Sequence, residues 1–291
     1  YLNVVEVVKL SKRIACVTLD IESDLLDKSG RIHMFENTDL MRRYSTIVQK
    51  HKIKVTGFLV TSLIEKYSAE IGRLSHTIPI EFGVHSHSHE RRLKYFADEV
   101  SSSIAAYEDF FGAPPIGYRA PNGLINREGI ISLIENQFKY DASIFPSIRM
   151  DEYGYSNLHL PNKPFRFVHS GNEIIELPAA CLDTIRLVFS MSYIKFLGLD
   201  IYKTLMRFFP LPDVVVLDSH PYDYYTNRIA ANIRGWKRYA HLRNGDKAFE
   251  VFESVVTLLQ EKGYEFMFMS ELYKYVTDLP KPPTVSVEKL R

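Results

Sequence analysis

The chain has 291 residues, a length that suits one barrel-sized α/β domain or two smaller domains. Its 36 Lys and Arg residues balance its 35 Asp and Glu residues, so charge gives no reason to expect a nucleic-acid partner. No apolar run reaches the roughly 18 residues that a membrane-spanning helix needs. Cys16 and Cys181 lie in apolar runs without redox or metal-binding spacing, and no export signal is visible, which favours a cytoplasmic protein.

The first part of the chain alternates short apolar runs with helical patterns. The apolar runs are rich in β-branched residues and are typical of buried strands. Strands that alternate with helices indicate parallel βαβ units. The predicted strands here are 14–19, 55–60 and 78–84, and the predicted helices are 38–51, 62–71 and 96–111.

The same alternation continues with shorter units in the rest of the chain. The segment 187–209 is amphipathic; core packing is its preferred use, and contact with a membrane surface is the alternative. Residues 146–172 lack any period and are expected to form an irregular excursion. Further strands are predicted at 116–118, 138–140, 174–177, 214–217 and 266–269, and further helices at 127–136 and 246–262.

These elements predict one α/β domain over residues 1–278, followed by a loose, proline-rich and lysine-rich tail at 279–291. Strands that are each followed by a helix indicate a distorted (β/α) barrel of about seven parallel strands. An open, doubly wound sheet is the alternative, but the glycine-rich first turn of many such folds is absent from the sequence. A polar, arginine-rich stretch surrounds Trp236.

Reactive side chains stand at the carboxyl ends of the predicted strands. In a barrel these ends converge on one mouth, where the active site of such folds lies. Buried charge is costly unless it is paired, so packing alone does not explain this placement. The residues are Asp20, His85, Arg119, Asp141 and His220.

Two of three closely spaced histidines have the spacing of metal ligands. His85 and His89 are four residues apart, and a helix at this point would place both imidazoles on one face. Two imidazoles and a carboxylate would form a zinc-type site with one open position. The alternative is a polar loop that happens to contain three histidines.

Five segments of this kind follow one another between residues 14 and 273. They are Thr18-Leu-Asp20-Ile-Glu22, His85-Ser-His87-Ser-His89, Arg119-Ala-Pro121-Asn122-Gly123, Tyr140-Asp141-Ala-Ser143 and Val216-Leu-Asp218-Ser-His220-Pro221. In this order they resemble the motifs of the polysaccharide deacetylase family, the NodB-homology domain of carbohydrate esterase family 4. The resemblance implies a single NodB-like catalytic domain.

The resemblance implies that His85, His89 and an acidic residue bind a divalent metal, in the first place Zn²⁺. Ile21 stands where the family has its second aspartate, so Glu22 is expected to be the ligand and Asp20 the general base. An exchange of these two roles remains open, and Asp24 is a more distant candidate. His87 is expected to point elsewhere.

Further site residues follow from the same resemblance. Arg119 would orient Asp20, and Asp141 would steer Arg119. The backbone after Pro121, near Asn122, would stabilise the oxyanion, and His220 would be the general acid.

Two positions depart from the family pattern. The tryptophan that often walls the acyl pocket is absent, and Phe145 or Ile144 would replace it. Asp218 stands where an apolar residue is common, and it would tether His220 or favour an unusual substrate.

The implied activity is metal-dependent removal of an N-acetyl group from an amino sugar, in a polymer or on a nucleotide-linked or lipid-linked precursor. A cytoplasmic enzyme of surface-glycan synthesis, in contact with the membrane surface where residues 187–209 allow it, fits best. Two alternatives remain: another amide hydrolase, such as an N-deformylase or a purine-breakdown amidase, and a catalytically silent glycan-binding module. Intact Glu22, His85 and His89 argue against a metal-independent amidase, and the presence of both the base and the acid argues against a silent module.

Overall fold

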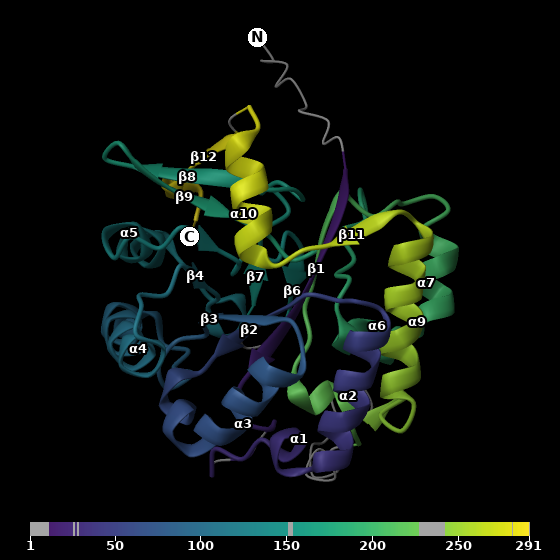
Figure 1. The fold of residues 1–291 in the computed structure, drawn as a ribbon. Coiled ribbons are helices and arrows are strands. Elements are labelled where there is room, and N and C mark those ends of the chain that lie inside the picture. The colour runs from purple at the N-terminus through teal and green to yellow at the C-terminus, as the bar shows by residue number, and fades with distance from the viewer. Residues whose placement is uncertain are drawn as a thin grey trace.

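The computed structural model describes residues 12–25, 27, 29–150, 154–226, 242–280 and 282–290 (Figure 1). The stretch around Trp236 lies outside these residues. The strands are β1 (Arg13–Ile21), β2 (Val55–Leu59), β3 (Ile80–Val84), β4 (Gly117–Tyr118), β5 (Tyr140–Asp141), β6 (Ile148–Arg149), β7 (Tyr155–Ser156), β8 (Phe165–His169), β9 (Asn172–Glu176), β10 (Val214–Leu217), β11 (Tyr264–Phe266) and β12 (Thr284–Ser286).

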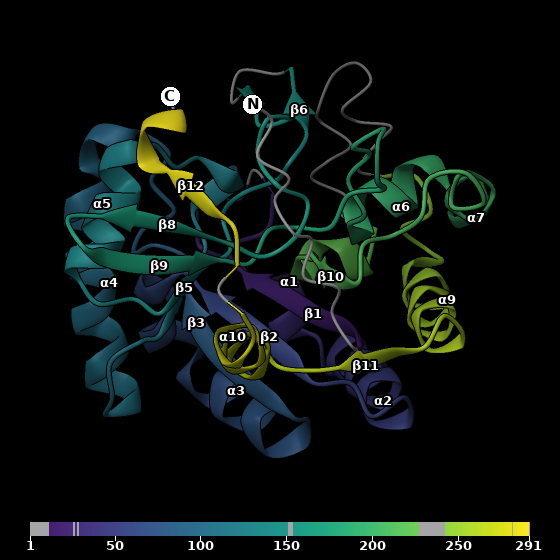
Figure 2. The same ribbon diagram turned by 90° about the horizontal axis from the view of Figure 1, so that it is seen from above.

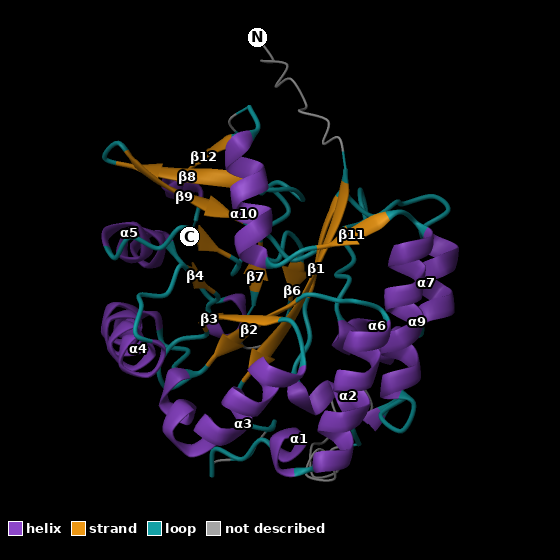
Figure 3. Ribbon diagram, viewed as in Figure 1, coloured by secondary structure: helices purple, strands orange, loops and turns teal. Residues whose placement is uncertain are grey.

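Helices separate most of these strands (Figure 3). The α-helices are α1 (His33–Glu36), α2 (Thr38–Lys50), α3 (Ile64–Thr77), α4 (Phe96–Phe111), α5 (Arg127–Glu135), α6 (Met191–Leu197), α7 (Leu199–Leu205), α9 (Ala248–Glu261) and α10 (Met269–Asp278). Short 3₁₀ turns are η1 (Thr61–Leu63), η2 (Leu93–Tyr95), η3 (Pro121–Gly123), η4 (Pro221–Tyr224) and η6 (Val287–Lys289).

Seven neighbouring strands, in the order β10-β1-β2-β3-β4-β5-β9, run parallel, and β11 joins the same sheet beside β1. Strand β8 continues antiparallel to β9, and β12 pairs parallel to β8. Within the described residues the sheet is an open path from β10 to β12. The predicted α/β fold class, a distorted (β/α) barrel of mostly parallel strands, is confirmed, and the ring of described strands is left open between β10 and β12.

The alternation of residues along β1 divides the molecule into layers. Ala15, Val17 and Leu19 face the helices α2, α3 and α9 outside the sheet. Ile14 and Cys16 face inward, where Met269, Leu272 and Val276 of α10 pack against them and against inward residues of β2, β5, β9 and β10. Figure 2 shows α10 beside β1 and β2. Apolar side chains therefore fill one end of the barrel.

The inward face changes character toward the carboxyl end of β1. Thr18 and Asp20 continue the row begun by Ile14 and Cys16, and both are buried. The core thus ends where polar side chains begin, and these polar side chains occupy the mouth of the sheet.

The amphipathic segment 187–209 forms two short helices rather than one. Gly198, with φ of +100°, separates α6 from α7. Met191, Ile194 and Tyr202 are buried in the main core, in agreement with the packing interpretation. No helix among the described residues is long and apolar enough to cross a membrane.

The structure differs from the sequence prediction in three segments. The excursion 146–172 contains a hairpin of β6 and β7 and also strand β8. The tail expected to be loose contains β12, because Val285 and Val287 are buried against Phe165 and Phe167. The last predicted strand is shifted, since β11 ends at Phe266 and Met269 already begins α10.

Candidate active site

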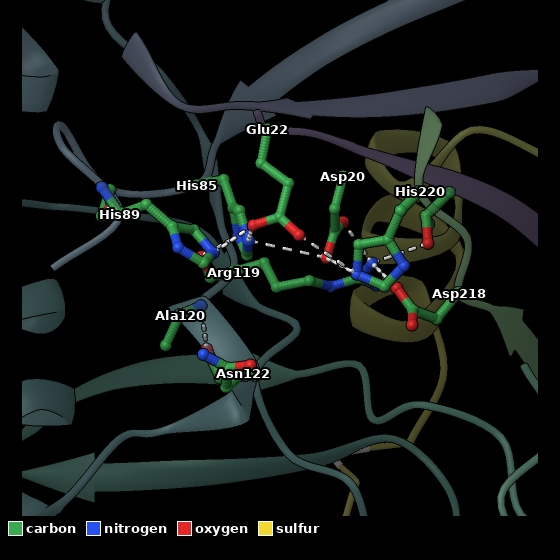
Figure 4. A network of polar contacts seen from close by, with 12 residues as sticks. Asp20, Glu22, His85, His89, Arg119, Ala120, Asn122, Asp218 and His220 are labelled. Carbon is green, nitrogen blue, oxygen red and sulfur yellow. Dashed lines mark hydrogen bonds and ion pairs between the residues drawn. The ribbon is translucent and has the colours of Figure 1, made fainter. Parts of the chain in front are cut away.

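Glu22, His85 and His89 meet at the mouth of the sheet (Figure 4). Glu22 directly follows β1, and His85 directly follows β3. The Glu22 carboxylate contacts Nε2 of His89 and lies 3.8 Å from Nε2 of His85. One ligand atom from each residue lies within 4.8 Å of the others. The expected metal ligands are thus brought together.

A turn, and not a helix, brings the two histidines together. Ser86 and His89 both have φ of +60°, and the Oγ of Ser86 accepts the backbone N–H of His89 at 3.0 Å. Glu99 of α4 accepts the N–H groups of His87 and Ser88 at 3.0 and 2.7 Å. These bonds fix a compact non-helical loop, so the helical explanation of the spacing is wrong.

The imidazole of His87 points away from the two others. Its Nδ1 lies 3.0 Å from the hydroxyl of Thr61, at the start of η1. This placement agrees with the expectation that His87 is not a ligand.

The donor set of this cluster fits a zinc-type ion. Nδ1 of His85 lies 2.8 Å from the carbonyl oxygen of Arg119, which can only accept, so Nδ1 carries the proton and Nε2 offers its lone pair. Burial acts to raise the pKa of Glu22, but His89, His220 and His85 outweigh burial and lower this pKa. An ionised carboxylate and imidazole nitrogens are ligands that Zn²⁺ takes in open, three-ligand sites.

Arg119 follows β4 and is buried beside two carboxylates. Its Nη1 donates to Oδ1 of Asp20 at 2.8 Å, to Oδ1 of Asp218 at 3.0 Å and to the Thr18 hydroxyl at 2.7 Å. The guanidinium also lies over the ring of Phe58, 4.4 Å from its centroid. Arg119 therefore touches the expected base, and Asp218 is its second acidic partner.

Burial changes the pKa values of Asp20 and Asp218 more than the arginine that they share does. Burial raises the pKa of Asp20, although Arg119 acts to lower it. Burial and the charge of Asp20 raise the pKa of Asp218 to about 6. One guanidinium shared by two buried acids leaves Asp20 with the basicity that a general base needs.

Asp141 has a different partner from the one expected. Its Oδ1 accepts the hydroxyl of Ser143 at 2.5 Å, whereas the hydrogen bonds of Arg119 go to Thr18, Asp20, Asp218 and the carbonyl of Ala142. Asp141 therefore makes no direct hydrogen bond to Arg119 of the kind expected, and the acidic partners of Arg119 are Asp20 and Asp218.

His220 follows β10 and lies across Glu22 from His85 and His89 (Figure 4). Its Nε2 lies 4.0 Å from Oδ2 of Asp20 and 3.8 Å from Oε1 of Glu22. Its Nδ1 lies 3.2 Å from Oδ2 of Asp223. Burial acts to lower the pKa of His220, but Asp218 and the hydrogen bond to Asp223 outweigh burial and raise this pKa to about 10.

Sequence reasoning missed the groups that support His220. Asp223 also contacts the buried Lys195, with Oδ1 3.4 Å from Nζ, and accepts the hydroxyl of Ser192 at 2.8 Å. Tyr222 donates to Glu22 Oε1 at 2.8 Å. An aspartate three residues after His220, at a turn that begins with proline, has the spacing of a helix cap and could have indicated Asp223. No sequence pattern indicates Lys195, since only the fold brings α6 to this turn.

The loop η3 after Arg119 lies against Phe145. Asn122 and Gly123 have φ of +56° and +68°. A Cβ at Gly123 would lie 2.8 Å from the Phe145 ring and 2.9 Å from the carbonyl of Ser143, so glycine is needed here. Phe145 in turn stacks on Tyr155 of β7 with ring centroids 6.3 Å apart. Pro121, Asn122 and Phe145 are thus neighbours.

Comparisons with known proteins agree with this architecture. Residues 11–140 match the family model for polysaccharide deacetylase, a range that holds the segments around Asp20, His85 and Arg119. No curated protein matches the chain.

Solved structures resemble the chain over most of its length. A proposed polysaccharide deacetylase from Mycobacterium smegmatis is 15% identical and aligns over 96% of both chains with a TM-score of 0.59. A peptidoglycan N-acetylglucosamine deacetylase is 14% identical over 91% of this chain and 89% of that chain, with a TM-score of 0.52. A family 4 pseudoenzyme from Bacillus anthracis is 13% identical over 90% of this chain and 66% of that chain, with a TM-score of 0.51. At these identities the likeness establishes the fold. Residues 11–140 therefore match the model of the polysaccharide deacetylase family, and the described chain as a whole has the fold of the solved polysaccharide deacetylases.

Proposed function

We propose that the protein removes the N-acetyl group from an amino sugar by metal-assisted hydrolysis. Glu22, His85 and His89 would hold the divalent ion, in the first place Zn²⁺. The observation that carries this proposal is the position of Asp20 and His220 next to each other beside that cluster, with Asp20 Oδ2 3.8 Å from Nε2 of His85 and His220 Nε2 3.8 Å from Glu22 Oε1. A base and an acid beside one three-ligand cluster suit amide hydrolysis.

The chain's own residues divide the work of the reaction. Asp20 takes the proton of the attacking water, and Arg119 holds its carboxylate in place through Oδ1. His220 delivers a proton to the leaving amine, and Asp223 orients its ring through Nδ1. The bound ion would supply water activation and charge stabilisation at the acyl oxygen. The backbone N–H near Asn122 adds a donor for the oxyanion, and Phe145 forms a wall of the acyl pocket.

The proposed substrate is an N-acetylated amino sugar, in a polymer or on a nucleotide-linked or lipid-linked precursor. The family match of residues 11–140 supports the amino sugar. A cytoplasmic role in surface-glycan synthesis, with or without contact to a membrane surface, belongs to the same proposal. The solved peptidoglycan N-acetylglucosamine deacetylase makes peptidoglycan fragments a necessary comparison substrate.

The test combines metal analysis with acetate release. The purified protein is expected to contain about one zinc per chain, and Zn²⁺-loaded protein should release acetate from N-acetylglucosamine oligomers, peptidoglycan fragments or nucleotide sugars. Comparison of the three substrates identifies the carrier. A folded, metal-loaded protein that binds these glycans without releasing acetate would overturn the proposal in favour of a silent binding module, and formate release from N-formyl substrates would favour an N-deformylase.

A further inference from the structure

Asp141 is fully buried and, although it does not contact Arg119, it connects to a metal ligand through other groups. The Ser143 hydroxyl lies 2.5 Å from Oδ1 of Asp141, and the backbone N–H of Ala120 donates to the same hydroxyl at 2.8 Å. The carbonyl of the same peptide group, on Arg119, accepts Nδ1–H of His85 at 2.8 Å. Hydrogen bonds and one peptide group thus link Asp141 to His85.

The direction of these hydrogen bonds follows from the groups involved. A carbonyl oxygen can only accept, so His85 donates; an amide N–H can only donate, so Ser143 accepts from Ala120. The hydroxyl proton of Ser143 is then free for the Asp141 carboxylate. All three bonds donate toward Asp141, and bonds aligned in this way polarise one another in a buried environment.

Glu176, at the end of β9, is the buried carboxyl group beside Asp141. Strand pairing places Asp141 directly opposite Glu176, and both are fully buried. Burial raises the pKa of Glu176 well above its usual range, and the nearby charge of Asp141 raises it further. Burial also raises the pKa of Asp141, but its hydrogen bonds with Glu176 and Ser143 act to lower it, so of the two carboxyl groups Glu176 is the one that favours the protonated form. Oε1 of Glu176 accepts the N–H of Ile144 at 3.0 Å, which holds this acid in place.

We propose that Asp141 and Ser143 are positioning residues for His85, and that they act through the peptide group between Arg119 and Ala120. They would fix the tautomer and the ring orientation of His85 and strengthen Nε2 as a metal ligand. A carboxylate bound directly to a ligating histidine has this effect in many metal sites; here a serine and a peptide group lie between them. The inference rests on the metal site of the proposed function.

Substitution of Ser143 or Asp141 should weaken metal binding without removing a ligand. Ser143→Ala and Asp141→Asn are each expected to lower Zn²⁺ affinity by about 10- to 100-fold, the usual effect of changing such supporting groups. Competition with a chromogenic chelator measures the affinity. Because both residues act through one series of bonds, the double variant should lose no more than the weaker-binding single variant. The visible spectrum of the Co²⁺-loaded variants should also change, since the orientation of His85 changes.

Two matched controls separate this role from general destabilisation. Glu176→Gln keeps a donor toward Asp141 and an acceptor for Ile144, so it should keep the Zn²⁺ affinity of the wild type. Ser103→Ala removes another fully buried hydroxyl, which bonds to the carbonyl of Val100 within α4, and should also leave Zn²⁺ affinity and activity unchanged. Asp141→Asn preserves size and shape, so it keeps the test valid if Ser143→Ala does not fold.

Wild-type Zn²⁺ affinity and an unchanged Co²⁺ spectrum in folded Asp141→Asn would overturn the inference. Additive losses in the double variant would also overturn it. A wild-type protein that binds no metal would instead overturn the proposed function. Tight metal binding that depends on Ser143 and Asp141, without acetate release, would support the positioning role while the proposed reaction fails.

Discussion

Asp20 and Glu22 stand two residues apart at the end of β1, yet one carboxylate binds Arg119 and the other contacts His89. The alternation of a strand sends both side chains to the same face, and Ile21 between them is buried in the core on the other face. Their different partners support the proposed division of roles, with Asp20 as base and Glu22 as metal ligand.

This division can be tested with three variants. His89→Ala and Glu22→Gln should lose bound metal and activity together, because each removes a ligand atom. Asp20→Asn should keep the metal and lose about 10²- to 10⁴-fold in kcat, the contribution of a general base. Elemental analysis and acetate release measure the two quantities. Metal loss in Asp20→Asn, with metal retained in Glu22→Gln, would exchange the two roles.

Asp223 should control the alkaline side of the pH profile. His220 must carry a proton in order to donate it, so activity is lost as pH rises through the pKa of His220. Asp223 helps to raise this pKa to about 10. Asp223→Asn removes that charge, and the alkaline limb of kcat/KM should therefore move to lower pH, by about 1 to 3 units.

Asp213→Asn is the control for this shift. Asp213 pairs with Arg13, both side chains are about half exposed, and neither belongs to the site. Its substitution should leave the profile in place. An unchanged alkaline limb in Asp223→Asn would show that another group sets it.

Arg119 should also be important for stability, because it is the direct ion-pair partner of two buried carboxylates. Arg119→Gln leaves both without this partner and should lower the free energy of unfolding by about 3 to 5 kcal/mol. The addition of Asp218→Asn removes one of the two acids and should restore part of the loss. Urea denaturation of metal-free protein measures the change.

An exposed arginine provides the comparison. Arg42 pairs with Asp39 on the surface of α2, where its side chain is 71% exposed. Arg42→Gln should cost less than about 1 kcal/mol. Equal losses in the two variants would contradict the importance assigned to burial.

Substitution of glycine by alanine should have opposite effects on stability at Gly123 and Gly72. Gly123→Ala places a Cβ against Phe145 and Ser143 at a residue with φ of +68°, so it should destabilise the protein by about 1 to 3 kcal/mol and reduce turnover. Gly72 lies inside α3 with open space around it, and Gly72→Ala should stabilise by about 0.5 to 1 kcal/mol. Thermal melting and acetate release would show both, and a stable, fully active Gly123→Ala variant would argue against a fixed loop.

The end of the chain provides a prediction about folding. Truncation after Asp278 removes β12 and exposes Phe165 and Phe167 of β8. The shortened protein should therefore melt at a lower temperature and be cleaved faster by proteases. A truncated protein as stable as the full chain would show that β12 contributes nothing.

The sequence predicts the strand ends of this site well, because short apolar runs end directly before Asp20, His85 and Arg119, and another ends three residues before His220. Two features of the structure were not predicted from the sequence, namely strands β8 and β12 and the partners of two site residues. Strand β12 is an edge element whose partner, β8, is distant in sequence, and the prolines and charges around both strands resemble a loop. The contact of Asp141 with Ser143 depends on loop geometry that no pattern specifies, whereas the spacing of Asp223 after His220 could have indicated their contact.

The positive φ of His89 affects which residues this position can accept. Histidine is held there at φ of +60°, a conformation that glycine or asparagine adopts more easily. Replacement of His89 by one of these residues would remove a proposed metal ligand but would also relieve an unfavourable backbone conformation. The position therefore carries a trade-off between stability and activity. A relative in which this residue has become glycine or asparagine would be expected to keep the fold and to have abandoned the metal, which gives a simple criterion for recognising inactive members among proteins of this architecture.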